Sequence, residues 1–137
     1  MKKLIVLTMA FLLIGSVSQA KYPVGISISM LKTPSAEGLA QIKASGVDYV
    51  EVVFNYFWRN VPENECYTRA YHVRALLEEA GLKVWSCHLP FSRQLDISVS
   101  DPALREQNVV LMERMIRLAS IFAPQRLVLH PSSEPIT

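Results

Sequence analysis

LKVWSCHLPFS, at residues 82–92, contains a predicted β-strand with a polar group at its tip. The first half of the segment is rich in strand-forming residues, and Gly81 separates it from a preceding helical pattern. His88 stands where the strand should end, because the proline that follows takes the backbone out of a sheet. The segment RLVLHP, at residues 126–131, repeats this design, with His130 at the predicted last strand position. The repetition predicts a site formed by two imidazoles at one edge of a sheet.

Strand-like and helical patterns alternate along the rest of the chain. Strands are predicted at residues 24–29, 47–54, 84–88 and 126–130, and an aromatic loop at 55–59. Helices are predicted from the N-cap Thr33 to Gly46, from about Glu65 to Ala80, and from the N-cap Asp101 to Ala123. This β-α-β-α-β-α-β order favours parallel strands joined by right-handed helical crossovers, with functional groups at the carboxyl ends of the strands.

The first 20 residues have the features of a secretory signal peptide. Lys2 and Lys3 form a basic start, residues 4–14 form an apolar segment, and Ser18-Gln19-Ala20 resembles a small-residue cleavage site. The apolar segment is too short for a stable membrane span, although an uncleaved anchor is the alternative interpretation. We therefore expect a mature protein of residues 21–137 that is periplasmic or secreted and has no membrane contact after cleavage.

Composition limits the classes of partner. Without the leader, 117 of the 137 residues remain, and the net charge falls from +2 to 0 because two lysines are lost. A chain of this size forms one domain with a modest core. No basic run or face remains, so a nucleic-acid partner is not expected.

Two cysteines, Cys66 and Cys87, would meet an oxidising compartment if the chain is exported. Their spacing leaves open whether they form a disulfide. It is not the spacing of a cysteine metal site.

Side-chain alternation assigns the residues of each predicted strand to one of two faces. In the third strand, Val84, Ser86 and His88 are expected on one face and Trp85 and Cys87 on the other. Large apolar residues suit the face packed under helices, whereas small and polar residues suit the interior of a barrel. The residues expected to face inward toward the site are Ser27, Glu51, Ser86, His88 and His130.

Imidazoles and a carboxylate that converge on one point suit a divalent metal or the hydroxyls of a sugar. Glu51 interrupts an apolar run, so its carboxylate must be paired, hydrogen-bonded or bound to a ligand, and Arg59 or Arg93 could serve as a plain ion-pair partner. Strand-end histidines can equally be structural. Asp96 is a further candidate for a polar contact in the loop after the third strand, as is Arg93.

The aromatic residues Tyr56, Phe57 and Trp58 have three interpretations. They could form the wall of a sugar pocket, cap the hydrophobic core, or contact another subunit.

Three segments together resemble the sugar phosphate isomerase/epimerase family, which has the xylose isomerase-like TIM barrel. They are WSCHLPFSRQLDIS at 85–98, DPALREQNV at 101–109 and RLVLHPSSEPI at 126–136. The resemblance extends over the whole predicted mature chain, and the H-L-P-F and L-H-P motifs at strand ends are fairly specific in combination. The family also contains apurinic endonucleases and inosose dehydratases.

The resemblance implies roles for particular residues. His88 and His130 match histidines that contact substrate in the epimerases and bind metal in the endonuclease branch, and Glu51 matches an acidic residue near the substrate. Together with Ser27 from the analysis of the faces and Trp58 from the aromatic segment, these are the expected substrate-binding residues. In the isomerases and epimerases, one divalent metal (Mn, Mg, Co or Zn) is held by residues from strands five to eight. Two glutamates there move a proton next to the sugar carbonyl.

A complete barrel of this kind needs about 250 residues. We therefore expect this α/β chain to be a (β/α)8 TIM-barrel type truncated to about four parallel strands and three helices. It would lack the main metal ligands and both acid/base residues, and would be inactive by itself. Its first and fourth strands would be open edges, which favour a homodimer or aggregation.

The leading hypothesis is an exported sugar isomerase/epimerase-like protein with a small-molecule carbohydrate as its partner. The alternative is a non-catalytic carbohydrate-binding or interaction module. An apurinic endonuclease-like hydrolase is less favoured, because export and the absence of a basic surface both argue against it.

Overall fold

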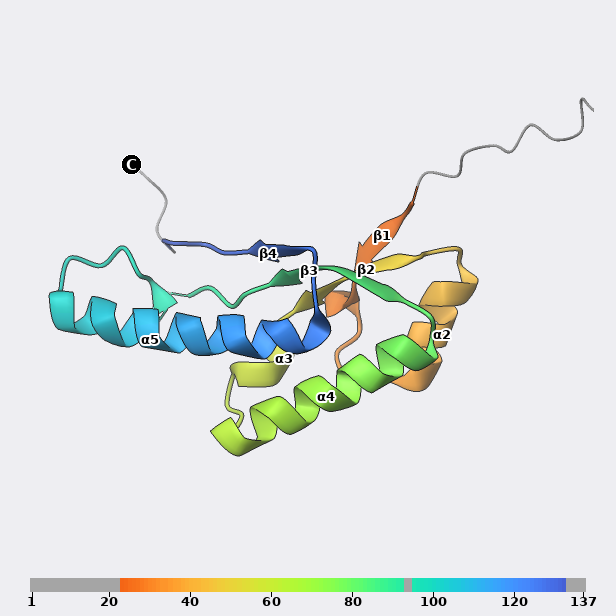
Figure 1. Cartoon of the computed structure of the whole chain (residues 1–137), viewed down its shortest axis with the longest axis horizontal. Coiled ribbons are helices and arrows are strands. Elements are labelled where there is room, and N and C mark those ends of the chain that lie inside the picture. Colours follow the sequence, from red (N-terminus) through yellow and green to blue (C-terminus); the bar gives the residue numbers. More distant parts are fainter. Residues whose placement is uncertain (1–22, 93–94, 133–137) are drawn as a thin grey trace, which may run out of the picture.

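The computed structural model of this chain describes residues 23–92 and 95–132 (Figure 1). Its elements are β1 (Gly25–Ser27), η1 (Ile28–Met30), α2 (Ala36–Ala44), β2 (Tyr49–Val53), α3 (Asn55–Trp58), α4 (Glu63–Glu79), β3 (Lys83–His88), α5 (Pro102–Ala119), η3 (Ser120–Phe122) and β4 (Arg126–Val128). The predicted signal peptide at residues 1–20 lies outside the described residues, as does Arg93.

The four strands form one parallel sheet in the order β1-β2-β3-β4. Helices α2, α4 and α5 connect successive strands, which the parallel arrangement requires. In Figure 1 the helices lie on one side of the sheet, and no described element covers the other side. The predicted α/β class with four parallel strands is confirmed, and the arrangement corresponds to part of a barrel.

Two predicted helix starts were wrong by a few residues. Ser35, not Thr33, is the N-cap of α2, because the Ser35 hydroxyl accepts a hydrogen bond from the Gly38 N–H at 3.2 Å. Helix α4 begins at Glu63 rather than Glu65. Both glutamates lie in the first turn, where a negative charge is stabilised by the helix dipole.

The predicted start of α5 and the predicted ends of α2 and α4 are confirmed, whereas α5 ends at Ala119 rather than Ala123 and the 3-10 turn η3 follows it. Asp101 caps α5, since its Oδ1 accepts hydrogen bonds from the N–H groups of Ala103 at 2.9 Å and Leu104 at 3.1 Å. Gly46 and Gly81 follow α2 and α4 with φ of 89° and 67°. Glycine adopts this left-handed conformation without the steric penalty of a Cβ, so both residues end their helices.

The aromatic segment at residues 55–59 is helix α3 for most of its length, not the loop that was predicted. Phe57 on this helix is 1% exposed, and its ring centroid lies 5.4 Å from that of Phe54 and 5.5 Å from that of Phe122. A single helical turn is too short to show a periodic pattern, so packing rather than periodicity fixes it.

The first and fourth strands are shorter than predicted. Ser29 belongs to η1 rather than to β1. Strand β4 ends at Val128, so His130 lies two residues beyond the strand and not at its last position. Val128 pairs with His88, the last residue of β3, so β4 ends where the strand beside it ends.

A β-bulge at Trp85 changes the predicted faces of β3. Val50 pairs with Val84, but the next residue of β2, Glu51, pairs with Ser86, so Trp85 is an extra residue. The prediction that Val84 shares a face with Ser86 was therefore wrong, and Val84 packs against the hydrophobic core. Strict alternation cannot anticipate a bulge, because a bulge breaks the period of two.

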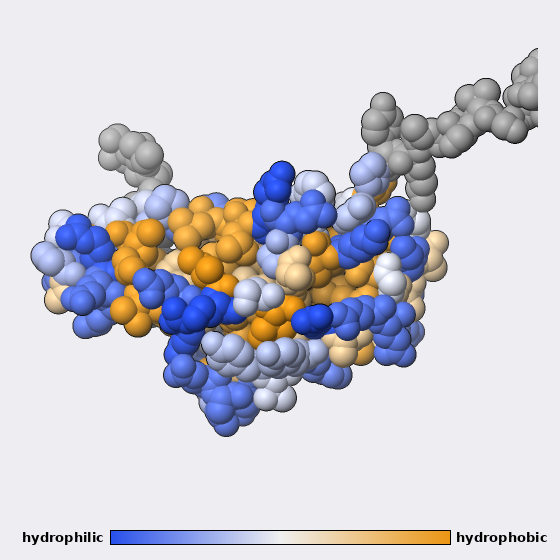
Figure 2. All heavy atoms as spheres, in the orientation of Figure 1, coloured by the Kyte–Doolittle hydropathy of each residue, from blue (hydrophilic) through white to orange (hydrophobic). Residues whose placement is uncertain are grey.

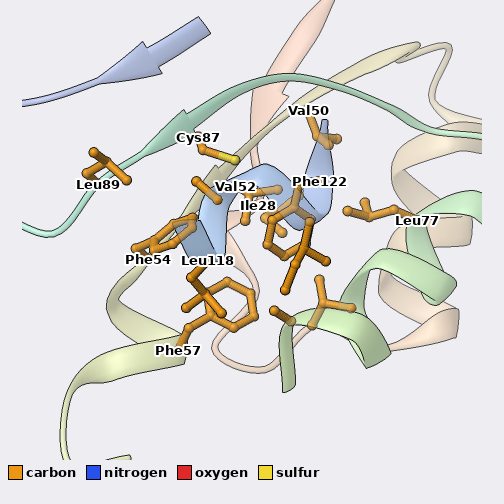
Figure 3. Close-up of a cluster of buried hydrophobic side chains, with 14 of the residues drawn as sticks. Ile28, Val50, Val52, Phe54, Phe57, Leu77, Cys87, Leu89, Leu118 and Phe122 are labelled. Carbon is orange, nitrogen blue, oxygen red and sulfur yellow. The ribbon is translucent and has the colours of Figure 1, made fainter. Parts of the chain in front are cut away.

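The hydrophobic core lies between the sheet and the helices (Figure 3). From β2 and the residue after it, Val50, Val52 and Phe54 are at most 1% exposed, and Leu77 of α4 and Leu118 of α5 meet them from the helical side. Each such side chain contributes about 1.5–3 kcal/mol when fully buried. This packing holds β2 in the middle of the sheet and presents its alternate residues on the opposite face.

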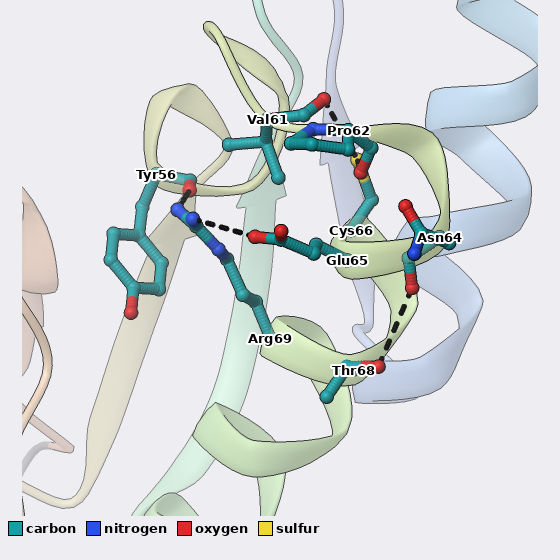
Figure 4. Close-up of polar contacts among 8 residues, drawn as sticks. All are labelled: Tyr56, Val61, Pro62, Asn64, Glu65, Cys66, Thr68 and Arg69. Atoms are coloured by element: carbon teal, nitrogen blue, oxygen red, sulfur yellow. Dashed lines mark hydrogen bonds and ion pairs between the residues drawn. The ribbon is translucent and has the colours of Figure 1, made fainter.

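Polar contacts join the start of α4 to α3 (Figure 4). Arg69 Nη1 donates to the Tyr56 carbonyl at 3.4 Å, Arg69 Nη2 donates to Glu65 Oε2 at 3.0 Å, and the guanidinium lies 5.5 Å from the Tyr56 ring centroid. The Cys66 thiol donates to the Pro62 carbonyl at 3.4 Å. The contacts of Arg69 fix the short aromatic helix against α4, and the thiol bond of Cys66 lies within the first turn of α4.

Both cysteines are free, buried thiols. Burial raises the pKa of Cys66, and burial together with the nearby charge of Glu51 raises the pKa of Cys87 from 9.0 to about 12. The structure thus has no Cys66–Cys87 disulfide, a question that the sequence left open.

Among residues 23–92 and 95–132, no helix combines the length and the apolar character that crossing a membrane requires.

Candidate functional site

One row of polar side chains crosses three strands on the uncovered face of the sheet. The strand register pairs Ser27 of β1 with Glu51 of β2, and Glu51 with Ser86 of β3. Ser86 Oγ donates a hydrogen bond to Glu51 Oε2 at 3.2 Å. Val50 and Val52, on either side of Glu51, point into the core, so alternation directs Glu51 to this face.

The carboxylate of Glu51 also contacts the first histidine. Its Oε1 lies 3.5 Å from His88 Nδ1, and the two side chains are 28% and 26% exposed, respectively. A half-buried carboxylate is costly without partners, and here it has a hydroxyl and an imidazole. The plain ion pair with Arg59 or Arg93 that the sequence left open is not needed to account for Glu51.

The two predicted histidines meet directly. His88 Nε2 lies 2.9 Å from His130 Nε2, and the rings are stacked with an interplanar angle of 11°. One nitrogen must donate and the other accept. The negative Glu51 favours the proton on His88 Nδ1, and we therefore assign His88 Nε2 as the acceptor and His130 Nε2 as the donor. In this assignment the charge of Glu51 sets the direction of the hydrogen bond between the two histidines.

Phe91, three residues after His88, lies beside both imidazoles. Its ring centroid is 4.4 Å from that of His130 and 6.0 Å from that of His88, and the residue is 51% exposed. The site thus combines an exposed apolar ring with polar ring nitrogens. Sugars present an apolar C–H face and polar hydroxyls, so both kinds of group can find a partner here.

A cavity of about 430 Å³ adjoins this row on the uncovered face. Ser27, Glu51 and Ser86 line it together with Tyr49 and Trp85, whose rings meet edge to face with centroids 5.8 Å apart. The volume is within the range of small-molecule sites. The bulge places Trp85 here, although alternation had assigned it to the helical face.

The structure brings together most of the predicted site residues. Glu51, His88 and His130 form one contact chain, and Ser27 lines the same cavity as Glu51. Trp58 is different: it lies on α3, half-buried at the margin of the hydrophobic core. In the described part of the chain, Trp58 does not line the cavity beside Glu51 and does not stack on a histidine. Its position therefore fits the interpretation that the aromatic segment caps the hydrophobic core.

Three aromatic residues at the site were not predicted. Phe91 was part of the H-L-P-F motif and could have been identified from its position three residues after His88. No feature of the sequence indicated that Tyr49 or Trp85 would line the cavity. Trp85 reaches it only through the bulge.

The described residues do not fit a metal site. Within residues 23–92 and 95–132, no group of three or more histidines, cysteines, aspartates or glutamates is arranged to hold a metal ion. His88 and His130, the two histidines that an endonuclease-like centre would use, are hydrogen-bonded to each other through their Nε2 atoms. We therefore derive no chemical step from a metal held by this chain.

No family model matches this sequence. No curated protein matches it either. Among solved structures, it is similar to a crystal structure of D-psicose 3-epimerase in the presence of D-fructose, with 15% identity and a TM-score of 0.61. The match covers 82% of this chain and 41% of that one, so this chain spans less than half of its length. At this identity the similarity establishes the fold alone, which is that of part of a TIM barrel.

Proposed function

We propose that this chain is the carbohydrate-binding N-terminal half of a sugar isomerase/epimerase-like barrel. The observation that carries the proposal is the contact chain Glu51–His88–His130, which ends beside the exposed ring of Phe91. Acceptors from Glu51 and from the remaining ring nitrogen of His130, together with an apolar ring face, match the hydroxyls and the C–H face of a sugar. The fold shared with a sugar epimerase supports the same class of ligand.

The proposal gives the residues of this chain a role in binding and orienting. Glu51 fixes the proton on His88, His88 fixes the proton on His130, and Phe91 offers a flat surface for the sugar ring. The family resemblance assigns proton transfer at the carbon next to the carbonyl to residues beyond strand four. We therefore expect no epimerisation of D-fructose or D-psicose by this chain alone, with or without an added divalent metal. Metal-dependent turnover by the isolated chain would contradict this expectation.

Titration of the chain with D-fructose, followed by NMR chemical-shift changes, tests the binding proposal. We expect saturable shifts centred on His88, His130 and Phe91. His130→Ala should weaken the binding about tenfold, equivalent to about 1.4 kcal/mol. His72→Ala is the matched control, because His72 is an exposed histidine on α4. An unchanged affinity in His130→Ala would contradict the assignment of the site.

A non-catalytic carbohydrate-binding module remains the second candidate, and the same four-strand architecture favours it. Sugar binding without turnover, both by this chain and by any longer product of its gene, would select this candidate.

We further propose that the chain is exported after cleavage behind Ala20. The support is the basic start, apolar segment and small-residue site at residues 1–20. The mass and N-terminal sequence of the native protein test it. A chain that begins at Lys21 is expected, whereas an intact Met1 in the native product would contradict export by this route.

A further inference from the structure

We propose that Asp96 is a positioning residue that holds His130 against His88. The inference rests on the proposed function only in taking the histidine pair to be the binding site. Asp96 lies in the segment between β3 and α5, and the sequence had marked it only as a candidate for a polar contact.

His130 needs such support because it lies beyond the regular strand. Strand β4 ends at Val128, so ladder hydrogen bonds do not fix the backbone of His130. The two residues that follow, Pro131 and Ser132, are instead tied to the loop after β3. The N–H of Ile97 donates to the Pro131 carbonyl at 3.1 Å, and Ser132 Oγ donates to Asp96 Oδ2 at 3.4 Å.

Asp96 is itself held firmly. Its Oδ1 accepts hydrogen bonds from the Ser98 N–H at 2.8 Å and the Ser98 hydroxyl at 2.6 Å. Its carbonyl accepts from Asn108 Nδ2 of α5 at 2.7 Å. Asp96 is 6% exposed and Asn108 is 4% exposed. The bonds to Ser98 fold the loop so that the intervening Ile97 N–H can reach Pro131.

The distribution of buried polar side chains supports this role. Among the described residues they are Ser86, Asp96 and Asn108. Ser86 contacts Glu51 at the site, and the other two form the link to the segment that carries His130. Burial of a carboxylate is costly unless its oxygens are hydrogen-bonded, and a loop that needed only stability could use an apolar residue here.

Imidazole ¹⁵N NMR at one fixed pH tests the proposal, because it reports the tautomer and hydrogen bonding of each histidine. In Asp96→Ala we expect displaced Nε2 signals for both His88 and His130, with His72 unchanged as the internal reference. Asp96→Asn should restore most of the wild-type pattern, since an amide oxygen can still accept from Ser98. Asp101→Ala is the matched control, because it removes a hydrogen-bonding aspartate at the start of α5 and should leave all three histidines unchanged.

A folded Asp96→Ala protein with wild-type His88 and His130 signals would overturn the proposal. If Asp96→Ala does not fold, Ser132→Ala decides, since it deletes one hydroxyl from a half-buried residue. A smaller displacement of the His130 signal in Ser132→Ala supports the proposal, and an unchanged spectrum overturns it. The sugar titration is a separate test. If the wild-type chain does not bind D-fructose, the proposed function is contradicted, but the ¹⁵N spectra still decide whether Asp96 positions His130.

Discussion

Glu51 directs the hydrogen bonds of the histidine pair, so its charge can be tested separately from its shape. In Glu51→Gln the amide N–H can donate to His88 Nδ1, which reverses the chain of donors and acceptors. We expect the fraction of His88 with the proton on Nε2 to rise, and His130 Nε2 to become an acceptor. Imidazole ¹⁵N spectra measure this directly. A His88 tautomer that is the same in both proteins would show that the 3.5 Å contact with Glu51 does not set it.

Cys87 predicts how stability depends on alkaline pH. Burial and Glu51 raise the pKa of its thiol to about 12 in the folded chain, compared with 9.0 ordinarily. Above pH 9 the unfolded chain therefore loses this proton and the folded chain keeps it. The stabilisation is complete below pH 9 and is lost as the pH rises toward 12, by at most about 1.4 kcal/mol per pH unit.

Urea unfolding of the wild type and of Cys87→Ala between pH 7 and 10.5 measures this effect. The wild type should lose more unfolding free energy above pH 9 than the variant does. Parallel pH curves for the two proteins would contradict the shift of the Cys87 pKa.

At the scale of single residues, sequence reasoning identified Ser27, Glu51, His88 and His130, and the structure places all four around one face of the sheet. They could be predicted because a polar side chain in an apolar strand is costly to bury unless it has a hydrogen-bond partner or a ligand. The position of Trp58 could not be predicted, because an aromatic side chain is equally common in a binding pocket and in a hydrophobic core. Only the packing of the folded chain distinguishes the two.

At the scale of elements, helix α5 depends on its N-terminal cap. Asp101 Oδ1 accepts two backbone hydrogen bonds, so Asp101→Ala should lower the unfolding free energy by about 1 kcal/mol. Urea denaturation measures this loss. Ser100→Ala, at the exposed neighbouring residue, is the control and should change the unfolding free energy by less than about 0.5 kcal/mol. Equal effects of the two substitutions would show that the cap contributes little.

The order and type of the long elements were predictable, because α2, α4 and α5 carry caps or terminal glycines and the strands between them are apolar. The shorter features were not. Helix α3 has one turn, β4 ends where β3 ends, and the bulge in β3 breaks the period from which faces are assigned. In each case the cause is a neighbouring element, which local sequence does not reveal.

The whole molecule presents a parallel sheet that is covered on one face. Parallel sheets are stable almost only when both faces are buried. Here Trp85 is 45% exposed on the uncovered face, and at the β4 edge Leu127 is 44% exposed. Apolar side chains also gather across the middle of the surface in Figure 2. In the part of the molecule that the structure describes, the sheet also has two open edges, at β1 and β4, where backbone groups can pair with another chain. We therefore expect the isolated chain to self-associate through these edges.

Light scattering after size exclusion measures this self-association, and a mass near twice that of the monomer is expected. Leu127→Lys should shift the population to monomer, because a charge on an edge strand opposes strand pairing. Val110→Lys, at a residue of α5 that is 58% exposed, is the matched control and should leave the mass unchanged. A wild-type chain that is monomeric at all concentrations would contradict the expectation.

The bulge at Trp85 has a consequence for how related sequences should be aligned. Deleting Trp85 would leave every other pairing between β2 and β3 intact, with Val84 and Cys87 still toward the helices and Ser86 and His88 toward the uncovered face of the sheet. A relative with a regular third strand would thus be one residue shorter here and keep the same site. An alignment that omits the gap opposite Trp85 would match His88 to a residue on the wrong face, and the shared histidine would be overlooked.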